Sequence, residues 1–200
     1  MKIIIRIVIA SLILGVASWV IIQVPSVQDR LMVAAFTALG SASNNLPEED
    51  ALSAAVCGSR SPLPSPGRAE TCILVAAGDD LFVVDIGDGS NQNLRSWNID
   101  FRNIEAVLIT HLHSDHIADL PGLHQNAWVV GERRSKLKVF GPEGVDQFTQ
   151  GIEMAYAHDY LFRNEHHGDA VAPLEYAGFD TSVIDLNNPV ISVSYTHLTL

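Results

Sequence analysis

The chain has 200 residues, of which 48% are hydrophobic and 18% charged, and this balance excludes an intrinsically disordered chain. A formal net charge of −11 counts against a protein that binds polyanions, because such proteins neutralise phosphates with Lys and Arg. Cys57 and Cys72 are the two cysteines, too few for a cysteine-rich zinc module. They could pair if the chain is exported, or remain two buried thiols.

The first segment is basic and then strongly apolar. Lys2 and Arg6 precede an uncharged stretch whose apolar core, 7–24, has 18 residues. As a helix it would be about 27 Å long, just enough to span a bilayer. Without a nearby cleavage site, we expect residues 1–27 to be a transmembrane anchor rather than a signal segment. The rest would lie outside the cytoplasm, periplasmic or extracellular. Residues 28–53 would be a membrane-proximal helix and linker.

Beyond residue 53, short apolar runs alternate between strand and helix patterns. Strands are expected at Cys72–Ala77, 81–86, 106–110 and 137–140, the first two forming a hairpin. Helices are expected at 91–97, 120–130 and 144–157. Alternation of strands and helices predicts a layered α/β domain.

The segment from His111 to His116, which reads HLHSDH, places three imidazoles and a carboxylate directly after the strand 106–110. Imidazole nitrogen and carboxylate oxygen are ligands that zinc and similar ions select. With this chain's content of His and Asp, the pattern HxHxDH would arise by chance on the order of once in a thousand such chains. The segment therefore predicts a metal site with His111, His113, Asp115 and His116 as ligands.

This motif resembles the ligand loop of the metallo-β-lactamase superfamily, and three turns resemble its ribonuclease Z and arylsulfatase-like branch. The turns are Gly58-Ser59-Arg60-Ser61-Pro62 with the Ser/Pro run after it, Val83-Val84-Asp85-Ile86-Gly87-Asp88-Gly89, and Phe140-Gly141-Pro142-Glu143-Gly144. The resemblance implies an α/β fold, the αββα sandwich of two sheets with helices outside. Residues 54–192 would form a partial domain, only its N-terminal half and a little more.

The resemblance also implies two divalent metal ions, zinc being preferred. His111 and His113 would hold one ion, and Asp115 and His116 the second. Asp115 would be the catalytic residue that orients or deprotonates the attacking water. Asp85 would accept a hydrogen bond from a ligating imidazole, or be a plain turn aspartate.

Four other residues receive no metal-binding role. We expect His166 and His167 to contact a ligand, to lie on the substrate side or to be simply exposed, rather than to bind a metal ion. Asp119 and His124 have no assignment.

The resemblance implies a hydrolase that uses a metal-activated hydroxide on an ester, sulfate ester or phosphodiester. Beyond residue 46, 22 acidic residues face 9 basic ones, a formal charge of −13. The basic cluster 133–138 is expected to be a solvated loop. We therefore expect a small-molecule ester or sulfate ester as substrate, the membrane as a partner through the N-terminal helix, and nucleic acid as unlikely. The alternatives are a ribonuclease Z-type tRNA 3′ endonuclease, an iron-dependent oxidoreductase and a non-catalytic binding protein; the oligomeric state is not predicted.

The last eight residues, 193–200, resemble a translated sequencing adapter and are expected to be an artefact. On that basis we expect the natural protein to be longer. This 200-residue chain would then be inactive alone, because the family's remaining ligands come later.

Overall fold

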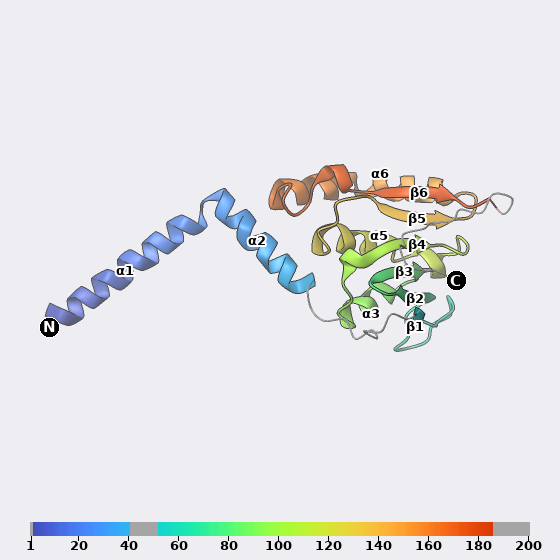
Figure 1. Ribbon diagram of the computed structural model, residues 1–200, viewed down its shortest axis with the longest axis horizontal. Coiled ribbons are helices and arrows are strands. Elements are labelled where there is room, and N and C mark those ends of the chain that lie inside the picture. The colour runs from blue at the N-terminus through green and yellow to red at the C-terminus, as the bar shows by residue number, and fades with distance from the viewer. Residues whose placement is uncertain (1, 41–51, 186–200) are drawn as a thin grey trace.

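The computed structural model describes residues 2–40 and 52–185 (Figure 1). The adapter-like segment 193–200 and residues 41–51 of the expected linker therefore lie outside the described residues. The helices are α1 (Lys2–Ile22), α2 (Pro25–Gly40), α3 (Ser90–Ser96), α4 (Ser114–Ile117), α5 (Leu120–Gln125) and α6 (Val145–His167). The strands are β1 (Leu52–Gly58), β2 (Cys72–Ala77), β3 (Asp80–Val84), β4 (Ile104–Leu108), β5 (Leu137–Gly141) and β6 (Phe179–Val183).

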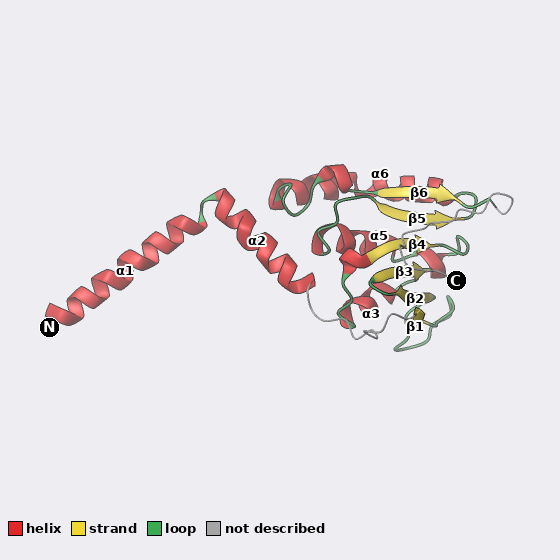
Figure 2. Ribbon diagram, viewed as in Figure 1, coloured by secondary structure: helices red, strands yellow, loops and turns green. Residues whose placement is uncertain are grey.

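The described strands form one sheet in sequence order, from β1 to β6. Pairing is antiparallel between β1, β2 and β3, and parallel from β3 to β6. Each parallel step needs a crossover, and the helices α3, α5 and α6 supply them. Figure 2 shows this alternation of helix and strand. The predicted mixed α/β class is confirmed, and it is consistent with the metallo-β-lactamase fold.

One face of the sheet is buried beneath helices. Leu74, Val83, Val107 and Val139 face one another across β2 to β5, and none is more than 1% exposed. Side chains from three helices complete this core, namely Leu94 of α3, Leu120 and Leu123 of α5, and Val145 and Ile152 of α6. Burial of each large aliphatic side chain contributes roughly 1.5 to 3 kcal/mol, so this layer is the main source of stability.

The opposite face carries a second apolar row. Ile73, Val84 and Leu108 are paired across β2, β3 and β4, and Ile73 remains 39% exposed. Strands that are apolar on both faces are typical of sheets covered on both sides. In a sandwich of two sheets, this row would face the second sheet.

Several elements differ from the sequence prediction, among them α6, β1 and β6. Helix α6 continues ten residues beyond the expected end, until Gly168 adopts a φ of 75° that suits glycine and ends the helix. Strand β6 was not predicted, because its sequence is only weakly apolar and it is fixed by pairing with β5.

The expected single transmembrane helix is not supported. In the described part of the chain no single helix is long and apolar enough to cross a membrane, although the bent pair Ile9–Ile22 and Pro25–Ala35 passes by length and composition together. The two helices meet at 82°, because Pro25 lacks an N–H and disfavours helical backbone before it. Helix α1 projects away from the sheet (Figure 1), whereas Met32 and Val33 of α2 pack against the cluster around Trp128. Residues placed in the expected linker therefore belong to the folded body.

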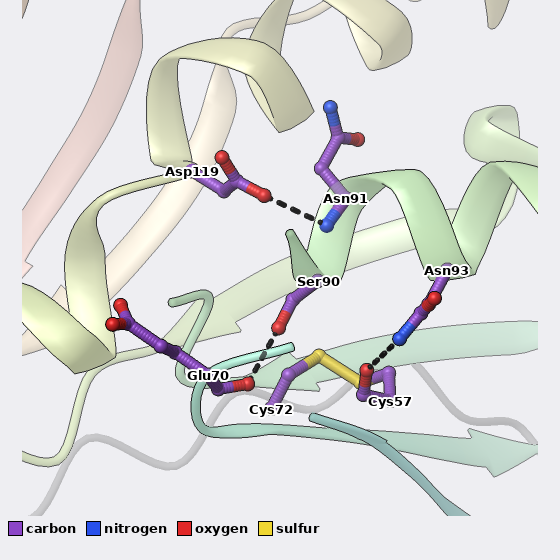
Figure 3. Close-up of a disulfide and its surroundings, with 7 residues drawn as sticks. All are labelled: Cys57, Glu70, Cys72, Ser90, Asn91, Asn93 and Asp119. Atoms are coloured by element: carbon purple, nitrogen blue, oxygen red, sulfur yellow. Dashed lines mark hydrogen bonds between the residues drawn. A yellow bond between two sulfur atoms is a disulfide. The ribbon is translucent and has the colours of Figure 1, made fainter. Parts of the chain in front are cut away.

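Cys57 and Cys72 form a disulfide between the end of β1 and the start of β2 (Figure 3). Both cysteines are at most 1% exposed, and the bond closes the loop 58–71. Asn93 of α3 donates a hydrogen bond from Nδ2 to the Cys57 carbonyl at 2.8 Å. Disulfides persist in exported proteins and are rare in the cytosol. The expected location outside the cytoplasm stays a prediction.

We expect the double substitution Cys57→Ala/Cys72→Ala to lower the free energy of unfolding by about 3 kcal/mol. A disulfide that closes a loop of this length lowers the conformational entropy of the unfolded chain, which stabilises the fold by about that free energy. Urea unfolding followed by circular dichroism measures the loss. A reducing agent should lower the stability of the unsubstituted protein similarly and leave the double variant unchanged. Equal stability of the two proteins without reductant would contradict a disulfide in solution.

His124 of α5 is a buried core residue. Its side chain is 1% exposed and lies among the rings of Trp128, Tyr160 and Phe179. Its Nε2 accepts a hydrogen bond from the backbone N–H of Gly178 at 2.8 Å. Burial lowers the pKa of the His124 imidazole from 6.5 to about 4, so the ring is neutral at pH 7.

This neutral ring makes stability depend on pH. Because the folded pKa lies below the unfolded value, the full contribution is present above pH 6.5 and is lost as the pH falls towards 4. We expect the free energy of unfolding, measured with urea, to fall between pH 7 and pH 5 in the unsubstituted protein. In His124→Gln this fall should be smaller by on the order of 2 kcal/mol. His158→Gln, at an exposed position of α6, is the matched control and should keep the original pH dependence. The same pH dependence in both variants would contradict a buried neutral His124.

Candidate metal centre

The histidine loop begins where β4 ends and closes into the single turn α4. Ile109 N–H donates to the Phe140 carbonyl at 2.7 Å, which holds the chain against β5 as it leaves the sheet. His113 precedes the first residue of α4, and its carbonyl accepts from the N–H of His116 at 3.0 Å. The local fold therefore turns the chain back within four residues of His111. All four predicted ligands come from this turn.

The structure brings the predicted ligands together. His111 Nε2 lies 3.1 Å from His113 Nδ1, and the rings of His111 and His116 have centroids 3.9 Å apart. His116 Nε2 lies 3.6 Å from Asp115 Oδ2. Asp115 is 6% exposed, whereas His111 and His113 are exposed. The cluster thus has a solvent-facing side and a buried carboxylate, and its metal-binding role stays a prediction.

Asp85 lies directly beneath the cluster, just after the last residue of β3. One oxygen, Oδ1, accepts from the backbone N–H of Thr110 at 2.8 Å. The other, Oδ2, accepts from the Thr110 hydroxyl at 2.7 Å and contacts His116 Nδ1 at 2.8 Å. Asp85 is 3% exposed and has a φ of 56°, a left-handed conformation that costs energy for a residue other than glycine. Its contact with a predicted ligand is the geometry expected of a carboxylate that orients an imidazole.

The turn containing Asp85 also joins the histidine loop to the disulfide-closed loop 58–71. The N–H of Gly87 donates to the Thr71 carbonyl at 3.0 Å, and the N–H of Ile86 donates to the His116 carbonyl at 2.8 Å. A Cβ on Gly87 would lie 2.1 Å from the Asp115 carbonyl oxygen and 2.5 Å from Glu70 Cβ. Only glycine allows the three segments to approach this closely.

The donor set suits a zinc-like ion in chemistry and in part of its geometry. Two nitrogens bound to one tetrahedral zinc lie about 3.3 Å apart, close to the 3.1 Å between His111 Nε2 and His113 Nδ1. His116 turns Nδ1 towards Asp85, which leaves Nε2 on the Asp115 side. Within residues 2–40 and 52–185, no group of three or more His, Cys, Asp or Glu side chains is arranged to hold a metal ion. Among the described residues the predicted ligands therefore do not form a complete metal site, and their metal-binding role stays a prediction.

The remaining candidates lie elsewhere. Helix α6 begins at Val145, near the histidine loop, and ends at His167. These two residues are 22 positions apart, which corresponds to about 33 Å along a helix. His167 therefore lies far from the histidine loop. His166 and His167 line a cavity with residues of α2, among them Asp29. Asp119 Oδ2 accepts from the N–H of Asn91 at the start of α3, and burial raises the pKa of Asp119 (Figure 3).

The basic cluster 133–138 is in part the solvated loop expected from its sequence, because Arg134, Ser135 and Lys136 are exposed, but several of its cations are also bound within the fold. Arg133 is 8% exposed and donates from Nη1 to the Ile104 carbonyl, and Arg134 donates from Nη2 to the Ala170 carbonyl at 2.8 Å. Lys138 forms an ion pair of 3.4 Å with Glu105 across β4 and β5. These cations join segments of the fold, because guanidinium donors match backbone carbonyls.

Two residues of the site were missed in the sequence. Thr110 contacts both Asp85 and His111, and Glu70 packs against Gly87 while Oε2 accepts from the N–H of Asp88 at 3.1 Å. The hydroxyl residue directly before His111 was a signal available for Thr110. Glu70 had none, because its place depends on the closure of loop 58–71.

Comparison with known proteins gives a consistent family. A model of the Metallo-beta-lactamase superfamily matches residues 65–187. Ribonuclease Z of Mycobacterium bovis (strain BCG / Pasteur 1173P2) is 37% identical over 118 residues, covering 58% of this chain and 42% of that relative. Ribonuclease Z of Mycobacterium marinum is 38% identical over 118 residues, with the same coverage. The chain thus spans under half the length of these relatives, and the ribonuclease Z branch is supported.

Solved structures agree on the fold. The metallo-beta-lactamase fold protein YhfI from Bacillus subtilis is 20% identical, with a TM-score of 0.51 over 70% of this chain and 48% of that chain. A long form RNase Z from yeast is 16% identical, with a TM-score of 0.52 over 70% of this chain and 19% of that chain.

The ribonuclease Z relatives overturn the expected partners. A small ester or sulfate ester as substrate, with nucleic acid unlikely, is wrong as a reading of this sequence. The error came from summing charge over the whole chain, whereas binding depends on the local field around a site. Metal ions at the acidic residues would also reverse the local sign of charge.

We expect Gly87→Ala to lower the free energy of unfolding by about 1 to 3 kcal/mol, because the added methyl group would collide with the Asp115 carbonyl and Glu70. Chemical denaturation measures the loss. Gly151→Ala is the matched control: a Cβ there has nothing within 4 Å, and alanine favours a helix by about 1 kcal/mol. A Gly87→Ala protein as stable as the original would show that the three segments are not packed closely in solution.

Proposed function

The chain belongs to the metallo-beta-lactamase superfamily. We propose that it is part of a metal-dependent hydrolase of the ribonuclease Z type, which cleaves a phosphodiester bond in RNA. The observation that carries the proposal is the family match over 65–187, which contains Asp85 and the whole histidine loop. The match to ribonuclease Z enzymes at 37% and 38% identity supports the choice of RNA.

We assign a role to each predicted ligand of the histidine loop. His111 and His113 would hold one divalent ion, since their facing nitrogens are 3.1 Å apart. Asp115 and His116 would hold a second. The ions, which we propose to be zinc, would supply Lewis-acid polarisation of the phosphate.

Asp115 has the second role in the proposal. Its carboxylate is 6% exposed, and its Oδ2 lies on the same side of the loop as His116 Nε2. A carboxylate held there would orient the attacking water and accept its proton. Asp85 would keep His116 oriented through the 2.8 Å contact with Nδ1.

The acidic composition is compatible with an RNA substrate. Asp85 and Asp115, two acidic residues of the site, are both buried: Asp85 contacts Thr110 and His116, and Asp115 lies beside His116 Nε2. Arg60 pairs with Glu70 at 3.1 Å and with Asp88 at 3.4 Å, so other charges near the turn are also offset internally. The formal charge of the chain therefore overstates the repulsion of a phosphate at the site.

The test is cleavage of a 3′-extended tRNA precursor with Zn²⁺ present. We expect a protein that contains this chain to cleave the precursor, His113→Ala in that protein to lower the rate at least about 100-fold, and residues 1–200 alone to be inactive. His158→Ala, an exposed histidine on α6, is the matched control and should keep full activity. Turnover of aryl esters or aryl sulfates with no cleavage of RNA would contradict the proposal, as would full activity of His113→Ala.

A further inference from the structure

We propose that Thr110 is a positioning residue that fixes the tautomer and orientation of His111. Asp85 would then preset two of the three imidazoles for metal binding, His116 directly and His111 through the Thr110 hydroxyl. The inference rests on the proposed metal-dependent function, and it assigns a task to a residue that no ligand motif includes.

The contacts form a continuous chain. The Thr110 hydroxyl donates to Asp85 Oδ2 at 2.7 Å and lies 3.1 Å from His111 Nδ1. The backbone N–H of Thr110 donates to the other oxygen of Asp85 at 2.8 Å. Thr110 is therefore held at two points by one carboxylate, so its hydroxyl has little freedom to turn away.

Counting protons fixes the direction of each hydrogen bond. A carboxylate offers acceptors, and a hydroxyl has one proton and can accept with its lone pairs. Because the Thr110 proton is used on Asp85, the hydroxyl must accept from His111. His111 therefore carries its proton on Nδ1 and presents the lone pair of Nε2 to the ion. His116, whose Nδ1 meets Asp85, presents Nε2 in the same way.

His113 is left as the ring that must change. The lone pair of His111 Nε2 faces His113 Nδ1 at 3.1 Å, so in the ion-free protein His113 donates from Nδ1. A metal ion pairs with lone pairs on both nitrogens, and the His113 proton then belongs on Nε2. Ion binding should therefore switch the tautomer of His113 and leave those of His111 and His116 unchanged.

The position and type of Thr110 suit this task. It follows β4 by two residues and sits opposite the strained backbone of Asp85, whose φ is 56°. The three contacts that Asp85 accepts help to keep it in that conformation. Valine at position 110 would keep the shape and remove the hydroxyl, whereas serine would keep the hydroxyl.

The experiment records ¹⁵N shifts and long-range couplings of histidine rings in the ¹⁵N-histidine-labelled full chain, at one pH, before and after Zn²⁺ is added. We expect the Nδ1–H tautomer at His111 in the ion-free chain, its loss in Thr110→Val and its recovery in Thr110→Ser. Zinc affinity, measured by competition with a chromophoric chelator, should fall about 10- to 100-fold in Thr110→Val and stay within a few-fold in Thr110→Ser.

The matched control is Thr181→Val on β6. The Thr181 hydroxyl lies 2.8 Å from the Thr149 hydroxyl and contacts no residue of the histidine loop. It should change neither the tautomers nor the affinity, and circular dichroism checks that each variant is folded. An Nε2–H tautomer at His111 in the unsubstituted chain would overturn the inference, as would a folded Thr110→Val protein with unchanged tautomer and affinity. The tautomer readout needs no turnover, so failure of RNA cleavage would reject the proposed function alone.

Discussion

The buried carboxylate of Asp85 is the interaction on which the rest of the site depends. It accepts the backbone N–H and the hydroxyl of Thr110 and meets an imidazole nitrogen of His116. Two of these groups belong to the strand end that leads into the histidine loop, and the third belongs to the loop itself. A left-handed aspartate is costly by itself, and these bonds offset the cost. Removing the carboxylate would leave the loop only backbone hydrogen bonds to the turn after β3, such as that from Ile86 N–H to the His116 carbonyl.

A second layer of support surrounds this carboxylate. The disulfide closes loop 58–71, the Thr71 carbonyl accepts from Gly87, and the neighbouring N–H of Ile86 donates to His116. Segments far apart in sequence thus meet at one glycine. The disulfide is remote from the imidazoles in the chain, yet two backbone hydrogen bonds connect its loop to a predicted ligand. Such rigid support limits how far ligands must reorganise when an ion binds.

Charge proved a poor guide to substrate in this protein. The acidic total pointed away from nucleic acid, and the ribonuclease Z relatives point towards it. The structure also shows where basic residues are used: Arg133 and Arg134 donate to backbone carbonyls, and Lys138 pairs with Glu105. Neither the acidic sum nor the basic run described a binding surface, because the function of a charge depends on its partner and burial.

The sequence by itself determined the alternation of strands and helices, the superfamily and the histidine loop, because each depends on residues close together in the chain. It also suggested Asp85, through a turn motif. Only the tertiary structure decided what the distant segments do. It bent the chain between α1 and α2 and packed α2 against the folded body, paired Cys57 with Cys72, and buried His124 as a neutral ring. It also set Thr110 between Asp85 and His111. These outcomes depend on contacts between residues far apart in sequence, which local patterns do not encode.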